Sequence, residues 1–465
     1  MHAFLRLPKP NLLFGLSAAF WAILFLLGGG ARADIQSLVV LRPLAALFLA
    51  YGLWGLTKQD IQSNKFLFGF VGVSTLLVVL HLVPLPHGLW SNLPGRGLIA
   101  EADTIAEIGA IWRPLSLLPT DSWNALFAML IPITAVVLVS RLTLEQRYLF
   151  LGLTLLVGLF SAFLGILQVL GPDGGSLYFY RITNRGTAVG LFANRNHHAV
   201  FLACLIPMLA VFASTATSRF GKRSFRLRAS VSAGAILFLL IVISGSRAGL
   251  LVALLGICAV PILYMPDKRA KNDTPNFFQI SKLKSKILIP AIAVLAVITV
   301  TILSSKAVSF DRLFGNDGQG ELRFEVWSPI AEQSWAYFPF GSGIGTFADV
   351  YKIHENRSLL QPEYLNHAHN DLLELLMTAG LPGLILLLVA AFAWSKRSYA
   401  VFFRERVNCQ SLMFARLGSV IILMLSIASL GDYPLRTPSL SGLLVLATIW
   451  MMESKKASVP DDLGK

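Results

Sequence analysis

YLFLGLTLLVGLFSAFLGILQVL, residues 148–170, is a run of 23 residues that contains no charged side chain. A helix of about 20 apolar residues spans the hydrocarbon core of a lipid bilayer, which is roughly 30 Å thick. The run therefore predicts a transmembrane helix.

Similar apolar runs recur along the whole chain. Of its 465 residues 55% are hydrophobic and only 14% are charged, and the mean hydropathy is +0.67, which is too apolar for a soluble domain. We expect an all-α, polytopic membrane protein with about twelve transmembrane helices. The runs lie near residues 12–28, 37–56, 66–84, 123–140, 148–170, 198–214, 231–244, 248–264, 286–304, 372–394, 414–430 and 438–452.

The net charge of +14 arises largely from basic residues in every second connection between these runs. Lys and Arg concentrate in the cytoplasmic loops of membrane proteins. The charge therefore reports membrane topology: it places both termini in the cytoplasm and argues against nucleic-acid binding. The basic connections contain Arg219, Lys222, Arg223, Arg226 and Arg228; Lys268, Arg269, Lys271, Lys282, Lys284 and Lys286; Lys396, Arg397, Arg404 and Arg406; and Lys455 and Lys456.

The predicted helices and loops divide the chain into four parts. These are N-terminal helices (1–170), central helices with polar motifs in their outward loops (171–304), one large periplasmic segment (305–371) and C-terminal helices with a cytoplasmic tail (372–465). The first helix also resembles a signal peptide, because Arg6 and Lys9 precede it and GGARAD follows it. Its apolar region is long for a signal peptide, so we favour an uncleaved helix.

Uncommon polar stretches fall in the connections that this topology places outside the cytoplasm. Because they meet one face of the membrane, we expect them to form one site, in which Arg195, Arg247, Arg323, His367, Asn370, Asp432 and Arg436 are candidates for substrate binding. The stretches are GLFANRNHHAVF with Asn194 to His198, ISGSRAGLL with Arg247, GELRFEVW with Arg323 and Trp327, NHAHND at residues 366–371, and GDYPLRTP with Asp432 and Arg436.

Some of these residues also have a purely structural interpretation. Arg247 could snorkel to the membrane interface, but a positive residue in a tight outward turn opposes the charge bias and so favours a function. Arg323 could be the solvated face of a helix. His197 and its neighbour His198 could simply cap the helix that follows them or pack against lipid headgroups.

Two further motifs favour structural roles. Asp432 and Arg436 could form a local ion pair that braces a proline turn, which we favour over a substrate role for the pair. Gly341, Gly343 and Gly345 do not lie between a strand and a helix, so they indicate a flexible turn rather than a nucleotide-binding loop.

The stretch NHAHNDLLELLMTAGLPGL, residues 366–384, places two histidines before an apolar run. Asp371 opens that run, so His367 and His369 precede a helix whose free N–H groups Asn370 or Asp371 can cap. The positive end of the helix dipole disfavours a second positive charge, so a neutral imidazole is expected there. Since a neutral imidazole near pH 7 suits a general base, His369 is the predicted catalytic base.

A metal site is the alternative for the same stretch. His367, His369 and Asp371 alternate along the chain and could ligate zinc or another divalent ion. A His-x-His pair lacks the remaining ligands at a recognisable spacing, and the three cysteines are scattered. The chain also has no Asp-x-Asp pair, which argues against metal-bound nucleotide sugars as donors. We therefore expect neither a metal nor another cofactor.

Taken in order, five motifs resemble those of the bacterial O-antigen ligase and polymerase superfamily. The resemblance extends over roughly residues 180–450 and rests on GLFANRNHHAVFLACLIP, ISGSRAGLL, LRFEVW followed by FGSGIGTF, NHAHNDLLELLMTAGLPGL and GDYPLRTPSL. It implies a GT-C-like helical fold in the bacterial inner membrane, with the active site facing the periplasm. It also implies that His369 is the base and that Arg247 and Arg323 hold a diphosphate. Thr378, where relatives often have Glu, and Leu372, where an aromatic is common, depart from the pattern.

The same resemblance implies that glycan is transferred from an undecaprenyl-diphosphate carrier to an acceptor hydroxyl. Such a donor has a good leaving group, so a catalyst must neutralise phosphate charge and deprotonate the acceptor. Arginine suits the first task because its planar fork binds phosphate oxygens through two hydrogen bonds. A single displacement would invert the anomeric centre.

The acceptor remains open at this level. We expect a ligase that acts on lipid A core, with a polymerase that extends another glycan as the alternative. The expected partners are the lipid-linked donor, one of these acceptors and membrane lipids. A transporter is a more distant alternative, because transporters place polar groups at mid-membrane and often contain internal repeats.

Overall fold

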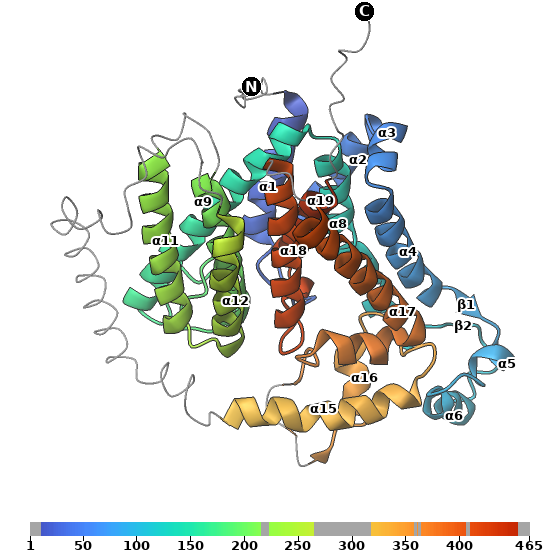
Figure 1. The fold of residues 1–465 in the computed structure, drawn as a ribbon. Helices are drawn as coiled ribbons and strands as arrows, with labels where there is room; N and C mark the ends of the chain where they lie inside the picture. The colour runs from blue at the N-terminus through green and yellow to red at the C-terminus, as the bar shows by residue number, and fades with distance from the viewer. Residues whose placement is uncertain are drawn as a thin grey trace, which may run out of the picture.

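The computed structural model describes residues 11–214, 223–264, 318–357, 360, 364–405 and 410–453, with the backbone alone for residues 318–324 (Figure 1). These residues are mostly helical, and their only strands, β1 (Pro84–Leu85) and β2 (Arg113–Pro114), pair antiparallel. The helices are α1 (Leu12–Leu27), α2 (Leu38–Trp54), α3 (Lys58–Ser63), α4 (Lys65–His81), α5 (His87–Trp90), α6 (Gly97–Ile105), α7 (Pro119–Ala128), α8 (Leu130–Ser140), α9 (Leu144–Leu170), α10 (Arg195–Ser214), α11 (Arg223–Ile243), α12 (Arg247–Leu263), α15 (Gly318–Ala336), α16 (Phe347–Ile353), α17 (Asp371–Tyr399), η4 (Ala400–Arg404), α18 (Gln410–Ala428), η5 (Pro434–Arg436) and α19 (Pro438–Met452).

The predicted apolar runs coincide with helices, except for 286–304, which lies outside the described residues. Within the described part, six helical segments have the length and composition needed to cross a membrane: 119–140, 144–170, 195–214, 223–243, 371–404 and 410–428. The described part also contains shorter apolar helices of 10–17 residues, namely α1, α2, α4, α12 and α19. The protein is therefore a helical, multi-pass membrane protein.

Helix α10 lies at the centre of the bundle. Nearly all of its side chains are buried, and it packs against α9, α11, α12 and α18. Aromatic residues from other helices extend this core, as where the indole of Trp21 donates a buried hydrogen bond of 3.1 Å to the Thr154 hydroxyl. The outer helices instead expose apolar side chains such as Leu388 and Phe392, as expected for helices that face lipid.

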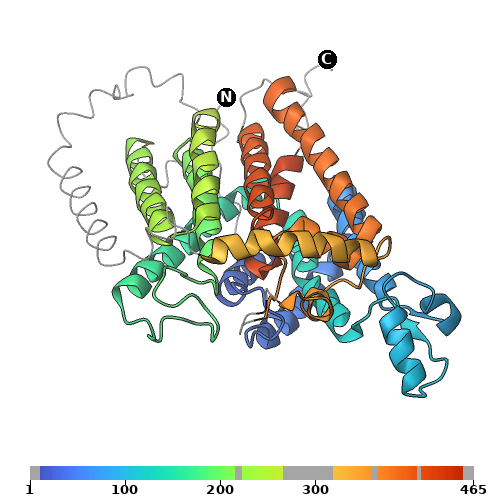
Figure 2. The ribbon, with the colours of Figure 1, turned by 90° about the horizontal axis from the view of Figure 1, so that it is seen from below.

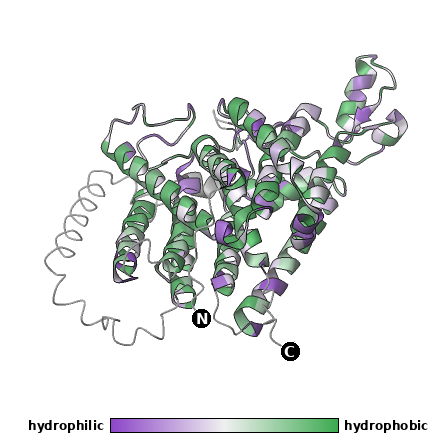
Figure 3. Cartoon of the chain, turned by 90° about the horizontal axis from the view of Figure 1, so that it is seen from above, coloured by the Kyte–Doolittle hydropathy of each residue, from purple (hydrophilic) through white to green (hydrophobic). Residues whose placement is uncertain are grey.

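The two ends of the bundle differ. The start of α1 and the end of α19 lie at the same end, while α15, α16 and the short α5 and α6 lie at the other (Figure 1). Seen from below, α15 runs across the ends of the upright helices (Figure 2). Hydrophobic residues dominate the helices, and hydrophilic residues are frequent toward the ends and in the loops (Figure 3). We call the end that carries α15 the α15 end.

Helix α17 is two helices joined at Gly380, whose φ of 58° and ψ of −144° are not helical. The loop before α16 compensates for the backbone bonds lost there. Ser342 and Gly343 donate their N–H groups to the carbonyls of Met377 and Thr378, both at 2.9 Å, and the N–H of Leu381 donates to Pro339 at 2.8 Å. The break leaves a short helix, residues 371–379, as a separate unit at the α15 end.

The glycine series proves to be a close-packed turn. Gly341, Gly343 and Gly345 all have positive φ, and a Cβ on Gly341 would lie 2.4 Å from the carbonyl oxygen of Thr378. The predicted turn is therefore present, and its glycines allow the backbone to approach the broken helix.

Residues 84–118 add short elements between the predicted apolar runs 66–84 and 123–140. They form β1, α5, α6 and β2, which lie beside the α15 end (Figure 1). The fully buried Arg96 donates to the carbonyls of Pro94, Leu115 and Gly341 at 2.7, 2.6 and 2.9 Å. This small lobe thus supports the loop that caps the break in α17.

Candidate functional site

His369 precedes the short helix in an unusual backbone conformation. Its φ of 49° lies in the left-handed region, which non-glycine residues rarely adopt. Such strain costs on the order of 1–3 kcal/mol and is often found at functional sites. The Asn370 side chain accepts hydrogen bonds from Leu372 N and Leu373 N at 3.0 and 3.2 Å, which confirms the predicted helix cap.

Asp432, in the loop between α18 and η5, holds His369 from the other side. Its side chain is 1% exposed, and its Oδ1 lies 3.5 Å from His369 Nδ1 and 3.6 Å from His197 Nε2. Its Oδ2 accepts a hydrogen bond of 2.8 Å from the Asn196 amide. Burial by itself would raise the pKa of Asp432, but the interactions with His197 and His369 hold it well below its usual range, so the carboxylate is ionised.

A second carboxylate lies beside the first. Glu374 of α17, whose side chain is 2% exposed, contacts His367 Nδ1 through Oε1 at 3.0 Å and Oε2 at 3.2 Å. It also accepts from Ala368 N at 3.0 Å and pairs with Arg436 at 3.1 Å. Arg436 donates to Asp371 as well, at 3.0 Å, so it joins η5 to the first turn of α17.

The ring of Tyr433 connects the histidines. Its centre lies 4.3 Å from that of His367, 4.9 Å from that of His369 and 5.0 Å from that of His197. Three segments that are far apart in the sequence, the start of α10, the residues around the start of α17 and the loop after α18, therefore meet at one cluster. We call this group, His197, His367, His369, Glu374, Asp432, Tyr433 and Arg436, the histidine cluster.

The predicted local pair of Asp432 and Arg436 is wrong. Asp432 contacts Asn196 and two histidines, whereas Arg436 contacts Asp371 and Glu374. The two residues flank a tight turn, and each finds a buried partner on another helix. Each of these pairs compensates a charge that is buried away from solvent. A local pair at the surface would not provide this compensation.

The two neighbouring histidines of α10 have different roles. His197 contacts Asp432, as described above. His198 is fully buried, and its Nδ1 lies 2.8 Å from the carbonyl oxygen of Ala188, so it packs the interior. The structural interpretation thus fits His198, while His197 belongs to the histidine cluster.

The structure locates the candidate phosphate-binding arginines less completely than it locates the histidine cluster. Arg247 is exposed at the first position of α12, behind the Ser246 cap, and Arg195 is half-buried at the first position of α10. Arg323 falls on α15, but its side chain lies outside the described residues. A cavity shared by Arg247 and Arg323 stays a prediction.

Glu374 and Tyr433 were missed in the sequence. Glu374 lies three residues after Asp371, so the two acids share one face of a helix, a spacing that could have indicated a common partner. Tyr433 adjoins Asp432 and carries no comparable signal. Among the described residues, no group of three His, Cys, Asp or Glu side chains is arranged to hold a metal ion.

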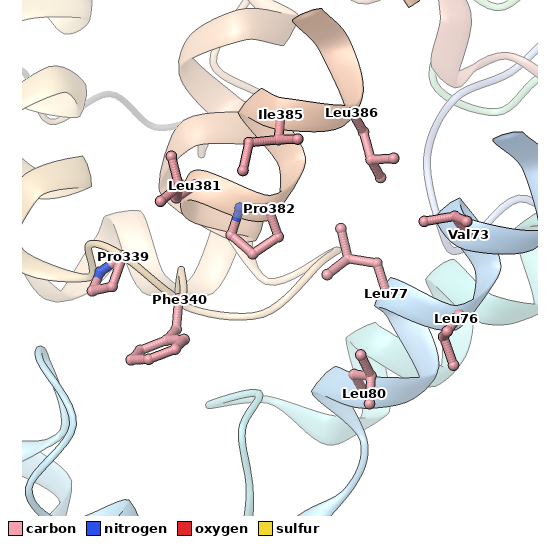
Figure 4. Close-up of a pocket in the computed structure, with 10 residues that line it drawn as sticks. All are labelled: Val73, Leu76, Leu77, Leu80, Pro339, Phe340, Leu381, Pro382, Ile385 and Leu386. Carbon is pink, nitrogen blue, oxygen red and sulfur yellow. The ribbon is translucent and has the colours of Figure 1, made fainter. Parts of the chain in front are cut away.

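An apolar cavity of about 440 Å³ lies apart from the histidine cluster, beyond the break in α17 (Figure 4). Its walls come from α4, from Pro339 and Phe340, and from the second part of α17. None of the lining residues has a group suited to acid–base or phosphate chemistry. They are Val73, Leu76, Leu77, Leu80, Pro339, Phe340, Leu381, Pro382, Ile385 and Leu386.

Comparison with known proteins bears on the same segments. Residues 232–388 match the family model described as O-antigen ligase, a range that includes Arg247, Arg323 and His369. A search of curated proteins found no significant match. The match supports a function of the O-antigen ligase or polymerase type, which acts on lipid-linked glycan. Residues 232–388, about a third of the chain, thus carry an O-antigen ligase domain, which supports the O-antigen ligase and polymerase superfamily.

Proposed function

We propose that this protein transfers glycan from an undecaprenyl-diphosphate carrier to an acceptor hydroxyl at the periplasmic face of the bacterial inner membrane. The observation that carries the proposal is His369, held in a strained conformation against the buried Asp432 carboxylate. Strain and a buried anion are both costly, and together they favour a catalytic histidine over a structural one.

In the proposed mechanism, His369 removes the proton of the acceptor hydroxyl. Its Nδ1 faces Asp432, and Nε2 is the ring nitrogen proposed to accept that proton. The ionised carboxylate then stabilises the imidazolium that forms. The acceptor oxygen bonds to the anomeric carbon, while the bond from that carbon to the phosphate oxygen breaks and its electron pair leaves with the diphosphate. A single displacement of this kind inverts the anomeric centre.

Arg247 and Arg323 are the proposed ligands of the diphosphate, and Arg195 is a further candidate. Both Arg247 and Arg323 lie within the matched range 232–388, and a guanidinium remains charged at any physiological pH. Because Arg436 is already paired with two carboxylates and Asn370 caps α17, we assign these two residues to positioning. With arginines in place, the mechanism needs no metal ion.

We propose lipid A core as the acceptor, which makes the protein an O-antigen ligase, with a polymerase as the second candidate. Both reactions use the same donor and differ in the acceptor. A strain lacking the gene distinguishes them through its surface glycan. Loss of attached long chains with free polymer retained indicates a ligase, and loss of the polymer itself indicates a polymerase. Unchanged attached and free glycan would contradict both.

A further inference from the structure

His367 and Glu374 form a second histidine–carboxylate pair beside the one assigned to the base. The contact is closer than that of His369 with Asp432: His367 Nδ1 lies 3.0 and 3.2 Å from the two Glu374 oxygens, against 3.5 Å for His369 Nδ1 and Asp432 Oδ1. The His367 side chain is 15% exposed and that of His369 is also 15% exposed. Both rings are thus anchored by a buried acid and accessible on another side.

The hydrogen-bond donors around Glu374 indicate which ring nitrogen of His367 carries a hydrogen atom. Glu374 accepts from Ala368 N and from Arg436, as an ionised carboxylate does. A carboxylate in that state accepts hydrogen bonds only, so the facing Nδ1 of His367 carries a hydrogen atom. The other ring nitrogen, Nε2, is then the one available to exchange a proton.

The charged groups beside His367 are Glu374 and Arg436. Arg436 is shared between Glu374 and Asp371, whose pKa is raised chiefly by burial. An imidazolium at His367 would give the buried Glu374 carboxylate a second positive partner. The other groups that face this ring are Tyr433 and, across it, His369 with Asp432 and His197.

We propose that His367 is a second catalytic residue of this site: as an imidazolium held by Glu374, it donates an Nε2–H hydrogen bond to the departing diphosphate. This inference rests on the proposed glycan transfer. In the displacement, His369 gains the acceptor proton, the diphosphate leaves with the electron pair of the broken bond, and His367 keeps its proton. The hydrogen bond strengthens as charge develops on the phosphate oxygen, so it lowers the barrier.

The local backbone accounts for how two histidines so close in sequence serve one reaction. Ala368 between them is fully buried, and the positive φ of His369 turns the chain. Both rings consequently pack on Tyr433, with centroids 4.3 and 4.9 Å from its own. One ring can therefore accept a proton while its neighbour donates a hydrogen bond.

The pH dependence of kcat tests the proposal with purified protein in lipid nanodiscs, a lipid-linked glycan donor and the acceptor. Wild type should show a bell-shaped profile, whose acid limb reports protonation of His369 and whose alkaline limb reports deprotonation of His367. His367→Ala should lower kcat on the order of 100-fold and abolish the alkaline limb. His367→Gln, which keeps a neutral N–H donor, should recover part of kcat without restoring that limb.

Glu374→Gln is the second variant. Without the carboxylate the imidazolium is less stable, so the alkaline limb should move to lower pH while the acid limb stays. His87→Gln on α5, outside the histidine cluster, is the matched control and should keep both limbs.

A His367→Gln variant with full kcat and an intact alkaline limb would overturn the inference, as would a Glu374→Gln profile identical to wild type. These failures differ from failure of the proposed function, because wild-type protein that transfers no glycan under any condition contradicts the function itself.

Discussion

At the scale of single residues, His369 combines three features that rarely coincide. It has a positive φ, it adjoins a buried carboxylate and it stands before a capped helix. The cap and the buried Ala368 fix the backbone, and Asp432 orients the ring. A residue constrained in this way is suited to act as a base without reorganising.

His369→Ala should therefore reduce glycan transfer by at least about 10²-fold, since a positioned general base contributes that much or more. Protein level and membrane insertion should be retained, because the cap does not involve the imidazole. Transfer in nanodiscs and donor binding are the measurements. Near-normal turnover of a well-expressed variant would refute the assignment of the base.

Asp432→Asn should keep the shape of the site but remove the negative charge of the Asp432 side chain. We expect kcat to fall on the order of 10³-fold, because the imidazolium loses its stabilising carboxylate. The pKa of Asp432 is lower in the folded protein than in the unfolded chain, where it is about 3.9. Its contribution to the free energy of unfolding is thus present above that value and is lost as the pH falls through the folded pKa.

Thermal unfolding of wild type and Asp432→Asn at several pH values measures this contribution. The difference between the two proteins should be present above about pH 5 and be lost in stronger acid, where Asp432 is protonated. A difference that vanishes already near pH 6 would contradict an ionised Asp432 with a lowered pKa.

Arg247→Lys should lower donor turnover by at least about 10-fold, because loss of one charge-assisted hydrogen bond costs roughly 1.5–3 kcal/mol. The same substitution at Arg323 should act similarly. Arg228→Lys is the matched control, since Arg228 is exposed on α11 and bonds only its own helix, at Ser224, among the contacts described. Equal activity of Arg247→Lys and the control would exclude a bidentate phosphate contact at Arg247.

At the scale of elements, the break in α17 separates two tasks. The part before Gly380 carries Asp371 and Glu374 into the histidine cluster, and the part after it is the apolar membrane segment. The turn at residues 339–343 accepts and donates the hydrogen bonds that an unbroken helix would make internally. The short helix can therefore point away from the axis that the membrane segment follows.

Gly380→Ala should disrupt the break in α17 and displace the short helix at residues 371–379. Its φ of 58° is strained for alanine, and the added Cβ would lie 2.2 Å from the Pro339 carbonyl oxygen. We expect the protein to lose more than about 2 kcal/mol of stability and most of its activity. Gly72→Ala on α4, where nothing lies within 4 Å of the new Cβ, is the control and should be neutral or slightly stabilising. Equal melting temperatures for the two variants would contradict a required break.

At the scale of the whole molecule, the site exists because several helix ends meet at the α15 end. Helix α17 begins there, α18 ends there, and α15 crosses the end of the bundle (Figures 1 and 2). The start of α10 meets them through the contacts of Asn196 and His197 with Asp432. Polar groups so placed can meet a diphosphate at the level of the lipid headgroups while the lipid tail remains in hydrocarbon. The proposed topology makes this end periplasmic.

Excess EDTA should leave glycan transfer by the purified protein unchanged, because arginines and histidines perform the electrostatic and proton-transfer steps. The comparison is turnover before and after chelation, with dialysis to remove bound ions. Activity that is lost and then restored by one divalent ion would instead support the alternative metal site at His367, His369 and Asp371.

The sequence alone determined the helical, membrane-embedded class, the positions of the apolar helices in the described residues, the cap at Asn370 and the resemblance to the O-antigen ligase family that the match at residues 232–388 supports. These features depend on runs and motifs of neighbouring residues, which a single stretch such as 148–170 contains in full. The lobe at residues 84–118 was not predicted, because its short elements lack an apolar run long enough to be distinguished from loop.

Only the tertiary structure decided which charges pair. Asp432 and Arg436 are four residues apart and invited a local pair, yet Asp432 binds Asn196 of α10 and Arg436 binds Glu374 of α17. The partners of a buried charge depend on which helix ends come together, and sequence spacing does not contain that information. Glu374 and Tyr433 joined the site for the same reason. Burial makes each unpaired charge costly, so the packing of the helices selects the pairs.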